Sequence, residues 1–218
     1  MSDKFKALSF TAKIQYIWEF YKLRITLIIA AIAFAVALIH GLATNARASL
    51  YCVVFNELNN EKIEKRVKSE YSDYTGCSQK EVSVNTGFGF RTLKFDGIKR
   101  MDEGSSIRFL SAQSTNEMDV IITDYDSMVW AESEEFLSDV KEVLPPKMYK
   151  KLEPYFVYAK SEEGSTQSDD IVYALDISNT DFYKGYSDNY SEAMIAFPNC
   201  SKNADAAIEF VECVYKIK

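Results

Sequence analysis

Residues 50–55 read Leu50-Tyr51-Cys52-Val53-Val54-Phe55, an apolar run rich in β-branched and aromatic side chains. A short run of this kind without a polar interruption is typical of a strand that is buried on both faces. Residues 118–123 (MDVIIT) repeat the pattern, and residues 81–86 alternate Val82 and Val84 with polar neighbours. The sequence therefore predicts three strands within its first 75 residues after position 48.

Helical patterns separate these three strands. Residues 61–74 carry Ile63 and Val67 four positions apart among charged residues, which is typical of an amphipathic surface helix. A second helix is predicted over residues 105–116, with three apolar residues facing inward: Ile107, Leu110 and Ala112. Strand, helix, strand, helix, strand in this order predicts two βαβ units and an α/β domain with a mainly parallel sheet, covered by helices in three layers.

The rest of the chain continues the alternation with denser turns. Further helices are predicted over residues 133–143, 147–152 and 203–215, and further strands over residues 155–159, 171–177 and 193–197. No internal repeat and no long linker is visible, so residues 49–218 are predicted to form one domain.

The segment from Ile25 to Ala43 is 19 residues long and has no formal charge. As a helix it would measure roughly 28 Å, about the hydrocarbon thickness of a bilayer. Lys22 and Arg24 precede it, and basic residues favour the cytoplasmic side of a membrane. We therefore expect an amphipathic cytoplasmic leader at 1–24, one membrane-spanning helix at 25–43, and an extracytoplasmic domain at 49–218.

Two other interpretations of this segment compete with the anchor. A cleaved signal peptide fits Ala46-Arg47-Ala48, which has the small-x-small pattern of a cleavage site, although the leader would be 48 residues long. A buried core helix would have to account for a run of this length without a charge. The anchor and the signal peptide place the domain in the same compartment.

Charge is distributed unevenly along the chain. Residues 1–44 hold five basic and two acidic side chains, a net charge of +3. Since the whole chain has a net charge of −7, residues 45–218 carry −10. An acidic domain repels phosphate backbones, and nucleic acid is therefore not an expected partner.

The chemistry that is missing from the sequence excludes several enzyme classes. The only histidine, His40, lies in the predicted membrane span, which leaves the domain without Ser-His-Asp, Cys-His or HExxH chemistry. Phosphate-binding and dinucleotide-binding glycine motifs are absent as well. We expect a protein that is not an enzyme and that uses neither a cofactor nor a metal ion.

In open α/β sheets, ligands bind beyond the carboxyl ends of the parallel strands. Here Asp124 is expected to anchor a cationic group, while Tyr125 or Phe88 packs against the apolar body of a small solute. The alternative is that these are loop residues that cap the following helices. The complete predicted site consists of Asn56, Glu57, Thr86, Phe88, Asp124, Tyr125, Asp126 and Ser127.

The domain contains four cysteines, an even number in an oxidising compartment. Cys52 and Cys213 fall within a buried strand and near the apolar face of a helix, where they can be packed thiols. Cys77 and Cys200 lie in predicted loops and are the favoured pair if one disulfide forms.

The order of elements from Leu50 to Thr123 resembles the first lobe of the type 2 periplasmic, or extracytoplasmic, solute-binding proteins. The strand MDVIITD at 118–124, and the strand at 194–197 followed by NADAAIEFVECVYKI at 203–217, look like the later strands and the closing helix of such proteins. The resemblance implies a reduced second lobe, because only about 35 residues, Tyr155 to Asn189, are left for it. The N-terminal layout also resembles uncharacterised membrane proteins of Gram-positive bacteria.

This resemblance implies a membrane-tethered extracytoplasmic binding domain for a small cationic or polar solute, a peptide or a partner protein. The alternative is a structural or docking subunit of a cell-envelope membrane complex. A pocket at the three strand ends would favour the first function, and a filled cleft with an exposed apolar patch would favour the second.

Overall fold

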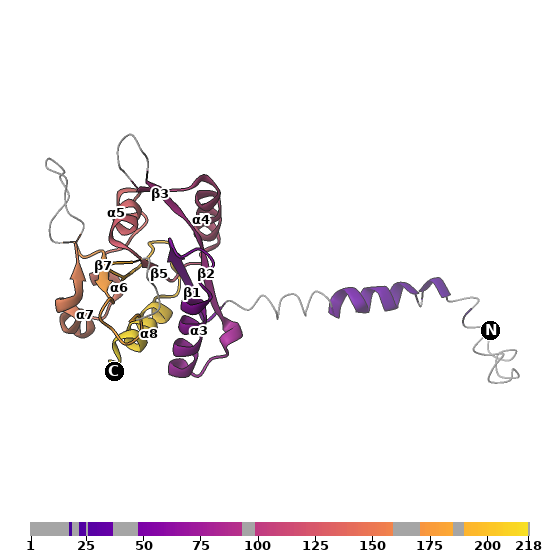
Figure 1. The fold of residues 1–218 in the computed structure, drawn as a ribbon. Coiled ribbons are helices and arrows are strands. Elements are labelled where there is room, and N and C mark those ends of the chain that lie inside the picture. The colour runs from indigo at the N-terminus through magenta and orange to yellow at the C-terminus, as the bar shows by residue number, and fades with distance from the viewer. Residues whose placement is uncertain are drawn as a thin grey trace, which may run out of the picture. The chain divides into compact units, whose positions relative to one another are not determined.

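The computed structural model describes residues 18, 22–24, 26–36, 48–92, 99–158, 171–184 and 190–217. The chain divides into two units, Met1–Arg47 and Ala48–Lys218 (Figure 1), and each is described by itself.

In the first unit, residues 26–36 are helical and their large apolar side chains are exposed. Within the part of the chain that the structure describes, no helix has both the length and the apolar character needed to cross a membrane. The predicted span at 25–43 lies partly outside the described residues, as do the leader at 1–24 and Ala46-Arg47, so the anchor remains a prediction.

The second unit is built on a six-stranded sheet with the order β2-β1-β5-β8-β7-β6. Strands β2, β1 and β5 are parallel neighbours, whereas β8, β7 and β6 each run antiparallel to the strand before them. As a result β7 points the same way as β1, and only β8 and β6 are reversed. The strands are β1 (Leu50–Phe55), β2 (Val82–Phe88), β5 (Val120–Thr123), β6 (Phe156–Val157), β7 (Ala174–Asp176) and β8 (Met194–Ala196).

Helices cover both faces of this sheet (Figure 1), which confirms the predicted α/β class with a mainly parallel sheet. One face packs against α3 (Glu61–Thr75), α6 (Val140–Val143), α7 (Pro146–Leu152) and α8 (Ala204–Tyr215). The other face packs against α4 (Glu103–Thr115), α5 (Tyr125–Ser133) and the hairpin of β3 (Phe90–Thr92) and β4 (Lys99–Met101). Short 3-10 helices span Gln79–Glu81 and Glu153–Tyr155.

Strand β1, the apolar run at residues 50–55, contributes side chains to the core on both faces of the sheet. Leu50, Cys52 and Val54 point into the core under α3 and α8, while Val53 and Phe55 point into the core under α4 and α5. Successive side chains of a strand alternate between faces, so a strand covered on both sides needs apolar residues throughout. Both core clusters consist of residues from the second unit only, and residues 48–218 can therefore be expected to fold on their own.

The helix predicted over 133–143 is wrong for most of its length. The longer helix of this region is α5, Tyr125–Ser133, which follows β5 directly because the Asp124 side chain caps it there. Glu135 adopts a left-handed backbone with φ of 58° and ends that helical segment, and Leu137 then bridges to Pro198. Only the short helix α6 remains of the predicted region.

Helix α4 forms where predicted, but its orientation differs. Ile107 and Leu110 are 66% and 55% exposed, whereas Phe109 is buried against Phe55, Phe88 and Trp130. The Phe109 ring joins a cluster of four other aromatic rings, and this cluster determines which side of the helix faces the core.

The predicted reduced second lobe is not formed by the described residues between Tyr155 and Asn189. These residues supply β6 and β7, which extend the single sheet beyond β8. Strand β7 pairs with β8, and β6 pairs with β7, so the segment is hydrogen-bonded into the sheet of the one domain.

Asp119 is a buried carboxylate that holds the start of β1 in place. It is fully buried, and its two oxygens accept hydrogen bonds from the Tyr51 amide and from the Ser201 hydroxyl, both at 2.9 Å. We predict that Asp119→Ala lowers the free energy of unfolding by about 2–4 kcal/mol, because it leaves buried donors without an acceptor. Urea unfolding of residues 48–218 measures this loss, and Asp73→Ala on the exposed side of α3 is the control. Equal urea midpoints for Asp119→Ala and Asp73→Ala would contradict the role of Asp119 as a buried hydrogen-bond acceptor.

Candidate functional site

Asp124, the centre of the predicted site, is already engaged within the protein. It caps α5 through Oδ1, which accepts the Ser127 amide at 3.0 Å, and through Oδ2, which accepts the Ser127 hydroxyl at 3.0 Å. The Lys99 ammonium lies 2.7 Å from Oδ1, and both side chains of this ion pair are largely buried. Lys99 thus occupies the place that was predicted for the cationic group of a ligand.

The carboxyl ends of β1 and β5 are connected by the same network. The Asn56 amide nitrogen donates to Asp124 Oδ2 at 3.4 Å, and the Asn56 backbone donates to the Phe88 carbonyl at 2.7 Å. Asn56, Asp124 and Ser127 therefore do come together at this edge, but they bind each other. The alternative prediction, that these residues cap the following helices, describes Asp124 correctly.

The other predicted site residues are placed differently. Phe88 is fully buried and packs edge-on against Phe55 and Phe109, so it is a core residue. Glu57 is buried and accepts a hydrogen bond from the Asn60 side chain at 2.8 Å. Thr86 is half-buried and Asp126 is exposed. Tyr125 lines a cavity beside β6 and β7.

Two cavities open beside β6 and β7, and we call them together the tyrosine groove. The first has a volume of about 280 Å³ and the second about 300 Å³. Tyr155 and Asp176 line both. The second cavity lies at the edge of the sheet where β5 and β7 end, which is the edge predicted for the site, but beside different strands.

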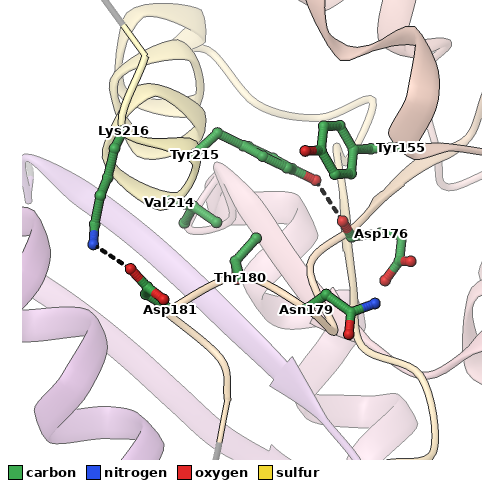
Figure 2. A pocket seen from close by; sticks show the side chains of 8 residues that line it. All are labelled: Tyr155, Asp176, Asn179, Thr180, Asp181, Val214, Tyr215 and Lys216. Carbon is green, nitrogen blue, oxygen red and sulfur yellow. Dashed lines mark hydrogen bonds and ion pairs between the residues drawn. The ribbon is translucent and has the colours of Figure 1, made fainter.

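The first cavity lies between the end of α8 and the turn after β7 (Figure 2). The rings of Tyr155 and Tyr215 pack together with a centroid distance of 4.9 Å, and the Tyr215 hydroxyl donates to the Asp176 carbonyl at 2.7 Å. Burial, with Asp176 nearby, raises the pKa of Tyr215, so this phenol stays protonated as a donor.

An ion pair closes the other end of the first cavity, as Figure 2 shows. Lys216 and Asp181 lie 2.7 Å apart, and the hydrogen bond from Lys216 lowers the pKa of the Asp181 carboxyl. The negative charge of Asp181 thus has its own cation within the fold.

The second cavity has a different composition. Its walls are the aromatic and apolar side chains of Tyr125, Tyr155, Phe156, Pro154, Val157 and Met194, and its charged groups are Asp176 and Glu192. No lysine or arginine is among the described residues that line it. Asp176 Oδ1 accepts the Ser178 amide at 2.8 Å and the Ser178 hydroxyl at 2.6 Å, which fixes the carboxylate at the end of β7.

Tyr155 is placed at the groove by its local sequence. Glu153-Pro154-Tyr155 forms a short 3-10 helix that ends where β6 begins, and Tyr155 is consequently held at the edge of the sheet with 40% of its surface exposed. An aromatic residue after a proline turn, next to a short strand, indicates an exposed ring, but its partners come from distant parts of the chain.

The predicted Cys77–Cys200 disulfide is not formed, and all four cysteines are free. Cys77 packs against the core beneath α3 and α8, whereas Cys200 packs against the core beneath α4 and α5, so the sheet separates the two thiols. Burial raises the pKa of Cys213 to about 12, and burial also raises the pKa of Cys52 and Cys200. These thiols are packing residues rather than nucleophiles.

Among the described residues, no group of three or more histidine, cysteine, aspartate or glutamate side chains is placed to hold a metal ion. Comparisons of the chain with protein-family models, with curated proteins and with solved structures give no match.

Proposed function

We propose that residues 48–218 form a non-catalytic binding domain, tethered to the outer side of a membrane by residues 25–43, and that this domain recognises its ligand in the tyrosine groove. The observation that carries this proposal is the pair of cavities that share Tyr155 and Asp176. The second cavity combines aromatic and apolar walls with two carboxylates, which is the usual composition of a ligand site, and the first adds mainly polar groups beside Tyr155 and Tyr215.

The size of the groove limits what it can hold. Each cavity has a volume of about 280–300 Å³, at the lower end of the ~300–1,000 Å³ range of small-molecule sites. A small solute or a single side chain of a peptide fits this volume, whereas a large cofactor does not.

The strand arrangement also supports a binding domain. Three parallel strands, β2-β1-β5, are followed in the sheet by the last strand, β8, which runs antiparallel to β5. This agrees with the resemblance to one lobe of an extracytoplasmic solute-binding protein that ends in a return strand and a helix. With one lobe, the domain would bind on an open groove instead of closing around its ligand.

A thermal-shift screen of residues 48–218 against amino acids, polyamines, short peptides and sugars tests the proposal. A ligand present at about 100 times its dissociation constant adds about 2.7 kcal/mol of stability. We expect at least one ligand of the screen to raise the melting temperature. This increase should be lost in Tyr155→Ala and kept in Asp126→Asn, a control variant in the site that the sequence predicted.

A hit that stabilises Tyr155→Ala as well as the unmodified domain would contradict a site in the groove. If nothing in the screen raises the melting temperature, the docking-subunit function becomes the better one. That alternative is favoured by the exposed pair Ile107 and Leu110 on α4, because exposed apolar groups on a helix face are available to a partner protein.

A further inference from the structure

The second cavity of the tyrosine groove carries negative charge that the described fold does not neutralise. Asp124 has Lys99 as its cation, and Asp181 has Lys216. Asp176 and Glu192, by contrast, form no ion pair with any described residue, although they line the same cavity of about 300 Å³. Two carboxylates on one cavity attract a cation from outside the chain.

The walls of this cavity are suited to the same kind of group. Tyr125 and Tyr155 present aromatic rings, and a cation within about 6 Å of such a ring is attracted by its π-electrons. Contact with Tyr215 holds the Tyr155 ring, and a hydrogen bond from the Tyr125 hydroxyl to the Tyr158 carbonyl at 3.4 Å holds the other. Pro154, Val157 and Met194 offer an apolar surface for an aliphatic stem.

The cavity adjoins the edge of the sheet. Strand β6 pairs with β7 through Phe156 and Val157, and it is the outermost strand in the sheet order. Tyr155 and Tyr158, on either side of β6, are 40% and 45% exposed. An extended peptide can lie along such an edge while one of its side chains enters the neighbouring pocket.

From these features we propose that the second cavity binds the lysine or arginine side chain of an extended polypeptide segment. The ammonium or guanidinium group is placed between Asp176 and Glu192, and its aliphatic stem packs on Tyr155. This inference rests on the proposed function, since it assigns a ligand class to the same groove.

Three probes show whether binding depends on the positive charge of the ligand or on its shape, and whether the ligand is a peptide or a free amine. These are acetyl-Ala-Lys-Ala-amide, the same peptide with norleucine in place of lysine, and 1,5-diaminopentane. Binding to residues 48–218 is followed by the NMR shifts of the amides of Tyr125, Tyr155 and Glu192. We expect the lysine peptide to bind about ten- to a hundredfold more tightly than the norleucine peptide, as for a charge-assisted hydrogen bond, and more tightly than the diamine.

The variants Asp176→Asn and Glu192→Gln each remove one charge with little change of shape, and each is expected to weaken the lysine peptide about tenfold. Glu192 is exposed, so its variant keeps the test valid should Asp176→Asn disturb the turn at Ser178. Asp126→Asn, at an exposed carboxylate outside the cavity, is the matched control and should leave the affinity unchanged.

Equal binding of the lysine and norleucine peptides at the groove would overturn the cation assignment and leave the groove as a binding site. Tighter binding of the diamine than of the peptide would replace the polypeptide by a small amine. If no probe shifts these resonances, the cation assignment fails, while the ligand screen with Tyr155→Ala still decides the proposed function.

Discussion

Replacing Val53 by aspartate is expected to unfold the domain of residues 48–218. Val53 is 1% exposed, and its strand lies between β2 and β5 with helices on both faces. Its side chain packs in the cluster with Phe55, Ile121 and Met128. An unpaired carboxylate in that position costs several kcal/mol, which is comparable with the total stability of about 5–15 kcal/mol that is typical of a small domain.

Circular dichroism and thermal melting of the purified domain measure the effect. Ile107→Asp is the matched control, because it introduces the same group on α4 at a position that is 66% exposed, where surface substitutions usually change stability by about 0.5 kcal/mol or less. A Val53→Asp domain that melts within a degree or two of the unmodified one would show that Leu50–Phe55 is not a central strand.

The parts of the fold that the sequence predicted well are those whose pattern depends only on burial. Leu50–Phe55 is apolar throughout because both of its faces are covered, and the strand forms with the predicted bounds. Helices α3 and α8 each present one apolar side to the sheet, and they form within a residue of the predicted ends. In each case the period of the apolar residues decides the element and its orientation.

The predictions failed where a helix cap or a cluster of aromatic rings competed with the pattern of apolar residues. The helix predicted over 133–143 does not begin at 133, because the Asp124 cap starts α5 earlier and Glu135 follows the end of α5. In α4 the periodicity of Ile107 and Leu110 indicated the wrong face, because the cluster of aromatic rings around Phe109 decided the packing.

The candidate site was the least predictable part, because its residues meet only in the folded chain. The ammonium of Lys99 reaches Asp124 from the β3–β4 hairpin, a pairing that no local spacing reveals. Strand β5 and helix α5 bring Tyr125 to the second cavity, and the antiparallel strands β6, β7 and β8 bring Tyr155, Asp176 and Glu192. The general rule for open α/β sheets indicated the edge at which the second cavity opens, but not the strands that line this cavity.

That residues 48–218 act on the outer side of a membrane is the claim on which the proposed function depends. It is a prediction from the uncharged run Ile25–Ala43 and from the basic residues that precede it. Labelling of intact cells with a membrane-impermeant thiol reagent tests it with the full chain, using Ser2→Cys in the leader and Ser133→Cys at an exposed position of the domain.

Cys77 and Cys200 are half-buried and should be replaced by serine in the background, while Cys52 and Cys213 are buried and can remain. We predict that the cysteine at position 133 is labelled in intact cells, and that the cysteine at position 2 is labelled only after the membrane has been permeabilised. Labelling at position 2 but not at position 133 in intact cells would contradict the predicted topology and, with it, an extracytoplasmic binding domain.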